Sequence, residues 1–255
     1  MEKLSLRQRA ISFLFLIVLI TFACEPFNDQ TVHSNPSSLS SYVESGDYII
    51  NPQTIFASLD RGEIDVFTPL PATQDPNTQL LPSGSISWTQ SNYLKIAEAL
   101  SQYVWQDTLT GWTVYYLAFD NQCQDNPVGF DSLEITFFKT IEVNGREFYT
   151  ARHIKIYPLA SIVSWGGGTN FSISEKWYGI DLAKFKVTAD DVQQMAEANG
   201  GAAARLGVEN DCRILIRTPN HDNDDRWDVS YYFGVNFEML VDPYTGKSQI
   251  PTPNP

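Results

Sequence analysis

The most constraining feature of this sequence is the stretch from Val187 to Lys247, because it contains a helix with a clear start and three strand patterns in close succession. Thr188 is a favoured N-cap residue, and Asp191 three positions later has the spacing of a capping box. Gly200, after the apolar stripe, is a residue type that commonly ends helices. The sequence therefore predicts a helix over residues 188–199.

Three strand patterns follow this predicted helix, and a turn closes the stretch. Hydrophobic and polar residues alternate from Cys212 to Arg217 and from Trp227 to Phe233, and a third pattern spans Phe237 to Val241. The sequence Asp-Pro-Tyr-Thr-Gly at 242–246 is typical of a turn. A helix and three short strands make one α-β-β-β unit, in which the helix can cover one face of a small antiparallel sheet.

A second set of elements with the same order lies earlier in the chain. A helical stripe runs from Tyr93 to Val104, and strand patterns follow at 112–119, 133–141 and 147–157. Asn144-Gly145 separates the last two and favours a tight hairpin. We therefore predict an α+β fold of two helix-plus-three-stranded antiparallel units that share a core. A single larger α+β sheet is the alternative.

The second unit resembles the PepSY domain, a small module of protease propeptides and bacterial envelope proteins. The residues that carry the resemblance are Ala196, Glu197 and Gly200-Gly201 of the helix, the strand Trp227-Asp-Val, and the ending from Val241 to Lys247. The resemblance implies a cystatin-like binding or inhibitory module, and it supplies no catalytic residues. The insert from Thr218 to Arg226 departs from the compact pattern of that family.

The N-terminal segment has the pattern of an export signal. Basic residues precede an apolar run from Ile11 to Ile20, which is too short to cross a membrane comfortably. Ala23-Cys24 resembles the lipobox of bacterial lipoproteins, whose mature N-terminal cysteine is acylated, although Thr21 and Phe22 depart from it. We expect an exported protein of the cell envelope, anchored on the extracytoplasmic side through lipid on Cys24. Ordinary cleavage and an uncleaved anchor are the alternatives.

Composition indicates five segments along the chain. Residues 24–45 are rich in Ser, Asn and Pro, and we predict a flexible tether there, after a signal peptide at 1–23. The first unit, with an irregular lead-in, covers 46–175, the second covers 176–250, and 251–255 form a tail. The formal net charge of −13 argues against nucleic acid as a partner, whereas 43% hydrophobic residues indicate a globular body.

Residue types that usually carry catalysis are scattered along the sequence. It contains neither a His-Glu-x-x-His metal motif nor a Gly-x-Ser-x-Gly elbow. The segment from Ser164 to Asn170 is rich in glycine but lacks the Lys-Ser/Thr of a phosphate loop, and we predict a mobile turn. His153 lies in a strand pattern, where a surface or hydrogen-bonded histidine is expected. We therefore assign no catalytic residue and no cofactor.

An acidic cluster precedes the strand that begins at Trp227. Asp222, Asp224 and Asp228 offer oxygen ligands at spacings similar to those of a calcium loop. The glycine and the distal glutamate of an EF-hand are missing, and Arg226 adds a repelling charge. We interpret the cluster as a solvated hairpin loop, with a calcium site as the alternative.

The cysteine count predicts one disulfide. Once Cys24 is assigned to the signal-peptide junction, Cys123 and Cys212 remain as an even pair in an exported protein. Cys123 follows a strand of the first unit and Cys212 opens the second unit's sheet, so the bridge would staple the two units together. Two buried free thiols are the alternative.

Three classes of function agree with these features. We favour a surface-tethered, non-enzymatic module that interacts with, or inhibits, an unidentified protein. The second class is a lipoprotein that binds a small ligand in an aromatic groove between the two units. The candidate aromatic residues are Tyr115, Tyr116, Phe119, Phe137, Phe138, Tyr149, Tyr231 and Tyr232, although strand aromatics are more often core residues. The third class is a hydrolase whose carboxylates come from distant parts of the chain.

Overall fold

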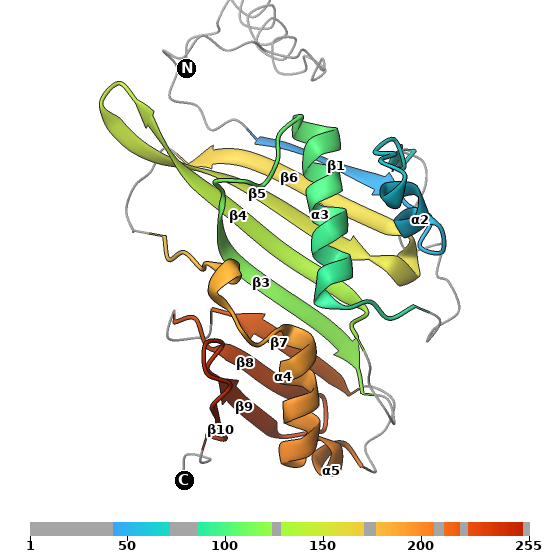
Figure 1. The fold of residues 1–255 in the computed structure, drawn as a ribbon, viewed down its shortest axis with the longest axis vertical. Helices are drawn as coiled ribbons and strands as arrows, with labels where there is room; N and C mark the ends of the chain where they lie inside the picture. Colours follow the sequence, from blue (N-terminus) through green and yellow to red (C-terminus); the bar gives the residue numbers. More distant parts are fainter. Residues whose placement is uncertain are drawn as a thin grey trace, which may run out of the picture. The chain divides into compact units, whose positions relative to one another are not determined.

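The part of the chain that the structure describes is built on one antiparallel β-sheet (Figure 1). The computed structural model describes residues 43–71, 86–123, 129–170, 177–206, 212–219 and 224–251. Within them, ten strands pair in the order β10-β9-β8-β7-β3-β4-β5-β6-β1-β2. Their bounds are β1 (Val43–Ile49), β2 (Thr68–Pro69), β3 (Thr113–Gln122), β4 (Ser132–Val143), β5 (Arg146–Tyr157), β6 (Ile162–Asn170), β7 (Arg213–Thr218), β8 (Trp227–Tyr232), β9 (Phe237–Val241) and β10 (Ser248–Gln249). The α-helices are α2 (Ile55–Asp60), α3 (Gln90–Trp105), α4 (Ala189–Ala196) and α5 (Ala202–Arg205).

Two runs of three consecutive strands meet at the centre of the sheet. β3, β4 and β5 pair in sequence order, and so do β7, β8 and β9; we call these runs the first and the second triplet. Their leading strands, β3 and β7, pair with each other from Leu117–Thr218 to Gln122–Arg213. The predicted α+β fold is therefore confirmed. The two triplets form one continuous sheet, which is the alternative that the sequence left open.

The helices α3 and α4 precede the two triplets and start in the same way. Thr89 caps α3 and Thr188 caps α4, and each side chain accepts a hydrogen bond from the backbone N–H three residues later. The two helix starts also contact each other. The Asp190 carboxylate accepts from the backbone N–H of Gln90 at 2.9 Å, and the Gln90 side chain accepts from that of Ala189 at 2.8 Å. Each helix thus satisfies an unpaired N–H at the start of the other.

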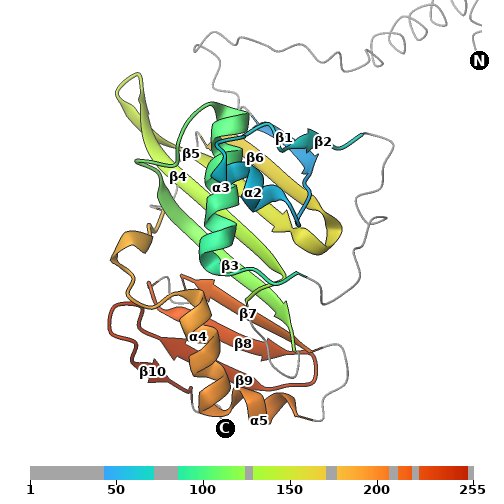
Figure 2. The same cartoon turned by 45° about the vertical axis from the view of Figure 1, so that its right-hand side comes forward.

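Both helices lie on the same face of the sheet, and the core fills the layer between them and the strands (Figure 1, Figure 2). Fully buried core residues include Tyr93, Leu100, Val192, Phe119 and Val229. They belong to one hydrophobic cluster with residues from both triplets, as the prediction of a shared core requires. Burying each such side chain stabilises the fold by about 1.5–3 kcal/mol.

Two boundaries differ from the prediction. The glycine-rich segment that was expected to be a mobile turn, Ser164 to Asn170, lies in β6, which pairs with β5 and β1. The prediction was wrong because consecutive glycines show no side-chain alternation, whereas pairing with the preceding strand β5 and with the distant β1 holds this segment extended. β1 begins at Val43, inside the segment predicted as a tether up to residue 45.

The helix predicted to end near Asn199 continues through a kink. α4 runs to Ala196, and a π-helical turn follows from Glu197 to Gly201. Gly200 there has a φ of +119°, a backbone conformation that favours glycine, and α5 adds one further turn. Glycine at this position therefore bends the helix before it ends.

Candidate functional site

The candidate site lies on the face of the sheet that is turned away from α3 and α4. Successive residues of a strand point to opposite faces, so Ala118 and Asp120 point away from the helices that cover Phe119. In the part of the chain that the structure describes, α3 and α4 both pack on the Phe119 side (Figure 2). We call the surface formed by Ala118, Asp120 and their cross-strand neighbours the open face.

A groove of about 660 Å³ crosses the open face. Its walls come from β1, β4, β5 and β6 on one side of β3 and from β7 on the other side. Tyr116 of β3 and Tyr157 at the end of β5 contribute aromatic rings, and Leu215 of β7 contributes an apolar side chain. Because the groove crosses the β3–β7 pairing, a ligand in it would touch both triplets.

Negative charge predominates in this groove. Four carboxylates and one guanidinium line it, namely those of Asp47, Asp120, Asp131, Glu134 and Arg213. Asp120 forms an ion pair with Arg213 and accepts a hydrogen bond from the Tyr232 hydroxyl at 2.8 Å. The charge of Asp120 is therefore balanced within the protein.

Glu134 is also balanced by its neighbours. Its carboxylate lies 3.2 Å from the Lys155 ammonium and 3.6 Å from Nε2 of His153. Nδ1 of the same ring lies 2.8 Å from the Thr136 hydroxyl. Burial lowers the pKa of His153, so its ring is neutral at pH 7 and Lys155 supplies the positive charge. His153 is thus a hydrogen-bonded strand residue, as its position in the sequence predicted.

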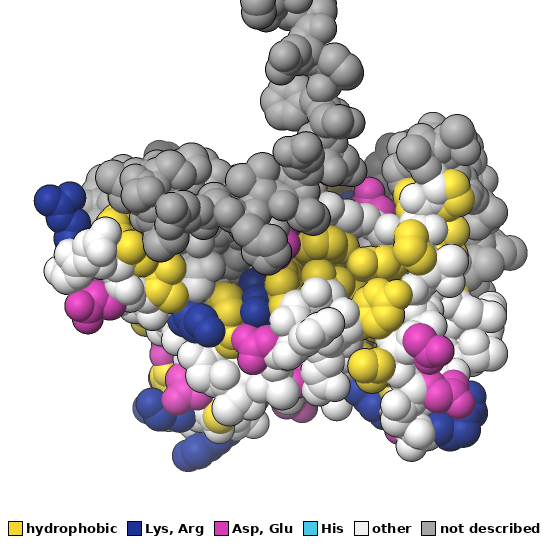
Figure 3. All heavy atoms as spheres, turned by 90° about the horizontal axis from the view of Figure 1, so that it is seen from above, with side chains coloured by type: hydrophobic (Ala, Val, Ile, Leu, Met, Phe, Trp, Pro, Cys, Tyr) yellow, Lys and Arg dark blue, Asp and Glu magenta, His cyan; other side chains and the backbone are white. Residues whose placement is uncertain are grey.

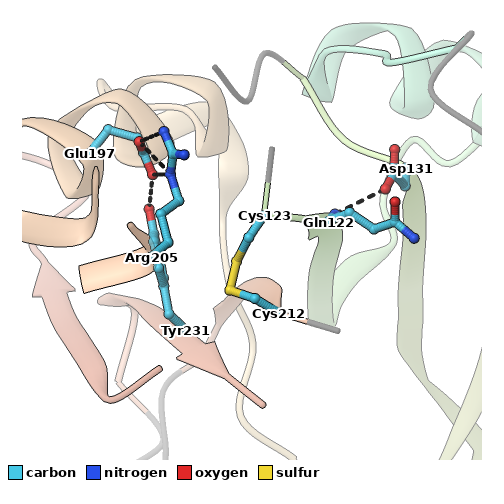
Figure 4. Close-up of a disulfide and its surroundings, with 7 residues drawn as sticks. All are labelled: Gln122, Cys123, Asp131, Glu197, Arg205, Cys212 and Tyr231. Carbon is cyan, nitrogen blue, oxygen red and sulfur yellow. Dashed lines mark hydrogen bonds and ion pairs between the residues drawn. A yellow bond between two sulfur atoms is a disulfide. The ribbon is translucent and has the colours of Figure 1, made fainter. Parts of the chain in front are cut away.

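Asp131 and Asp47 carry the unbalanced charge of the groove. Asp131 is only 8% exposed, and its Oδ2 accepts a hydrogen bond from the backbone N–H of Gln122 at 3.0 Å (Figure 4). Burial raises the pKa of Asp131, because the ionised carboxylate is poorly solvated there. Asp47 is exposed at the β1 end of the groove. Among the described residues, neither side chain forms an ion pair with a Lys or Arg. A buried carboxyl with a raised pKa is a recognised marker of functional sites.

A disulfide joins Cys123 to Cys212 beside this groove, as predicted (Figure 4). Their Cα atoms are 5.2 Å apart, and the backbone N–H of Cys123 donates to the carbonyl of Cys212 at 2.9 Å. Cys123 directly follows β3 and Cys212 directly precedes β7, so the bridge fixes one end of the pairing on which the groove depends. Disulfides persist in oxidising compartments, and this one indicates an extracytoplasmic environment.

The acidic cluster proposed as an alternative calcium site is divided in the structure. Asp224 forms an ion pair with Arg226 at 2.7 Å, and Asp228 forms one with Arg217 at 2.9 Å. Asp222 lies outside the described residues. Within the described residues, no group of three or more His, Cys, Asp or Glu side chains is arranged to hold a metal ion. The calcium site stays a prediction that would need Asp222.

The aromatic residues predicted to line a groove are distributed over four places. Phe119, Phe137 and Tyr231 are buried in the core, and Tyr116 lines the groove. Three others surround a ring that the sequence did not single out, Trp177, whose centroid lies 4.9, 5.4 and 5.1 Å from those of Tyr115, Phe138 and Tyr149. Tyr232 lies elsewhere, where it contacts Phe233 and donates a hydrogen bond to Asp120. These residues therefore do not line a single groove between the two units.

The sequence did not identify Asp47 and Asp131 as site residues. Alternation along the predicted strands could have placed Asp120 and Glu134 on one face. No pattern in the sequence indicates that β1 lies two strands from β5, which is what brings Asp47 to the same groove.

Comparisons with known proteins identify no relative of this chain. No helix within the described residues is long and apolar enough to cross a membrane, and Cys24, the predicted lipid attachment site, lies outside those residues. No protein-family model, curated protein or solved structure matches the chain.

Proposed function

We propose that this protein is an envelope-anchored, non-enzymatic binding module that recognises a protein partner through the open face of its sheet. The observation that carries the proposal is the groove of about 660 Å³, which both triplets line and in which carboxylates outnumber cations. The partner that fits this surface presents a segment with Lys or Arg side chains. Nucleic acid, whose phosphates are negative, does not fit it.

Charge complementarity favours a basic segment over a neutral one. Asp131 is buried without a cation, which costs stability at neutral pH, and a Lys or Arg side chain placed beside it would remove that cost. Asp47 offers a second carboxylate at the other side of the groove. Complementary charges of this kind determine which partner binds and accelerate the encounter.

The predicted export signal and lipid on Cys24 agree with this function. A tether would hold the folded part at the surface of the membrane, with the open face available to a second protein of the envelope. The PepSY-like ending of the second unit supports a binding or inhibitory role, because that resemblance implies recognition and supplies no catalytic residue.

A display experiment tests the proposal. A library of random twelve-residue peptides on phage is selected against the full folded protein, and enriched peptides should be rich in Lys and Arg. Asp131→Asn combined with Asp47→Asn should weaken their binding about tenfold or more, since each replaced carboxylate removes a charged contact. Glu238→Gln is the matched control, because Glu238 is an exposed acidic residue of β9 that does not line the groove.

Two results would contradict the proposal. The first is the enrichment of acidic or uncharged peptides, and the second is equal weakening of binding by the Glu238→Gln control. The second result would assign the attraction to the overall charge of −13 and not to the groove.

The size of the groove also favours a second candidate, a small ligand that carries amino groups. A volume of about 660 Å³ lies within the usual range for small-molecule sites. Spermidine is a suitable probe, and it should raise the melting temperature of the wild-type protein but not that of the Asp131→Asn and Asp47→Asn variant. Stabilisation by spermidine without any selected peptide would favour this candidate over a protein partner.

A further inference from the structure

A second, smaller pocket lies on the opposite side of the sheet, beyond the end of α3. It has a volume of about 170 Å³, and β1, β4, β5 and β6 all contribute to it. α3 ends at Trp105, and the strands continue past that point, so their ends are not covered by the helix (Figure 1). Figure 3 views the molecule from this end and shows hydrophobic side chains gathered there, with Lys or Arg side chains among them.

Arg152 lies between two indole rings and is fixed in place. Its guanidinium carbon is 4.6 Å from the centroid of the Trp105 ring and 4.1 Å from that of the Trp112 ring. Asp107 pairs with it at 3.1 Å, and the Ser101 hydroxyl accepts a hydrogen bond from it at 3.2 Å. Its side chain is only 11% exposed. Cation–π contacts and an ion pair thus hold a positive charge at the wall of this pocket.

Lys139 adds a second cation that is more available. Its ammonium lies 4.8 Å from the centroid of the Trp112 ring, and it forms no ion pair with a carboxylate among the described residues. On the far side of the pocket, Glu44 accepts a hydrogen bond from the Trp105 indole N–H at 2.6 Å. The pocket therefore combines aromatic rings, the Glu44 carboxylate and two cations, of which Arg152 is paired with Asp107 and Lys139, within the described part of the chain, is not.

Gly167 of β6 has no side chain, and this leaves room above the strand for Glu44 and Trp105. A Cβ atom at Gly167 would lie 3.2 Å from Glu44 Oε1 and 3.3 Å from Trp105 Nε1, which is tighter than most contacts of this kind. The glycine-rich run, predicted as a turn, thus permits the Glu44–Trp105 hydrogen bond to lie directly on the strand. The hydroxyls of Thr150 and Thr169 line the pocket next to it.

We propose that this pocket binds an acidic sugar, one pyranose ring that carries a carboxylate, as in a uronic acid unit of a glycan. The C–H groups of a pyranose pack against indole rings, and its hydroxyls need partners such as Thr150, Thr169 and Glu44. Lys139 is placed to pair with the carboxylate. A neutral sugar would leave that cation without its partner.

Tryptophan fluorescence provides a direct test, because Trp105 and Trp112 form part of the site. Methyl β-D-glucuronide should change the emission of the wild-type protein in a saturable manner, and methyl β-D-glucoside, its neutral analogue, should do so about tenfold less tightly or not at all. Lys139→Gln should weaken glucuronide binding by a similar factor. Lys155→Gln is the matched control, because Lys155 lies on the open face and should leave binding unchanged.

Three outcomes would overturn the proposal. They are the absence of a saturable change with the glucuronide, equal affinity for the glucoside, and unaltered binding by a Lys139→Gln variant whose circular dichroism matches the wild type. Inorganic phosphate is titrated in parallel, and tighter binding of phosphate than of the glucuronide would identify an anion site without sugar recognition. Binding in this pocket is independent of the groove, so either proposal can fail while the other stands.

Discussion

The two strand triplets have the same plan but different proportions. α3 has 16 residues, about 24 Å of helix, whereas β4 and β5 have 12 residues each, about 40 Å. In the second triplet the strands have five or six residues, about 20 Å, and α4 with its π-helical turn is about as long. The strands of the second triplet therefore extend little beyond their helix. In the first triplet, β4 and β5 extend well beyond the length that α3 can cover.

This difference in strand length explains where the pockets lie. The aromatic and cationic pocket occupies the part of the first triplet that α3 does not reach. The acidic groove lies on the open face of the same strands and extends to the second triplet only at β7. We infer that the second triplet, whose short strands are covered along their length on the helix side, mainly supports the first and completes one wall of the groove.

The largest expected loss of stability comes from removing the disulfide that links the two triplets. In the variant with Cys123→Ala and Cys212→Ala, the unfolded chain regains the freedom of a loop closed over a sequence separation of 89, which the chain-entropy model puts at about 4–5 kcal/mol. Guanidinium unfolding should show this loss of stability. If the second triplet depends on the first, hydrogen exchange should accelerate in β8 more than in β4.

Cys24→Ala serves as the control for the disulfide variant, because Cys24 is not part of the bridge. It should leave the unfolding curve unchanged. Equal stability of the bridged and unbridged proteins would show that the β3–β7 pairing and the shared core hold the triplets together without the covalent link.

A smaller loss is expected from an ion pair that packs against the second triplet, between Glu197 of the π-helical turn and Arg205 of α5. Arg205 contacts the Glu197 carboxylate at 2.7 Å, the Tyr231 hydroxyl donates to the same carboxylate at 2.5 Å, and the Arg205 side chain is only 8% exposed (Figure 4). Arg205→Ala would leave Glu197 partly buried without its cation, which should cost about 3 kcal/mol. Urea unfolding monitored by circular dichroism measures this loss.

An exposed ion pair in the first part of the fold gives the comparison. Arg61 and Glu63 pair at 2.7 Å, but their side chains are 59% and 43% exposed. Solvent screens such a pair, so Arg61→Ala should leave the unfolding midpoint nearly unchanged. Equal losses for Arg61→Ala and Arg205→Ala would contradict the view that burial gives the second pair its importance.

Local sequence signals predicted the elements well and their assembly less well. Thr188 and Asp191 form the expected capping box, and β9 has the predicted bounds, Phe237–Val241, because caps and alternation depend on residues close in sequence. β6 was missed because its glycines carry no pattern, and only its pairing with β5 and β1 makes it a strand. The disulfide was predictable from the cysteine count. Asp131 was not, because its importance depends on burial and on a groove that distant strands assemble.

The smallest effect expected at a buried group, and the sharpest test of the groove, concerns Asp131. Burial raises the pKa of its carboxyl in the folded state, so the stability that this group contributes is fully present below its unfolded pKa, near 4, and is lost as the pH rises through the folded value. Asp131→Asn removes the ionisable group and keeps an oxygen to accept from the Gln122 N–H. The variant should therefore be more stable than the wild type at pH 7.5, with a difference that shrinks toward pH 4.

Melting temperatures measured across this range, with the exposed Asp47→Asn as the control, check the prediction. A stabilised Asp131→Asn variant that also loses the selected basic peptides would show that the carboxylate opposes stability and serves binding, whereas a destabilised variant would assign Asp131 to the support of the fold.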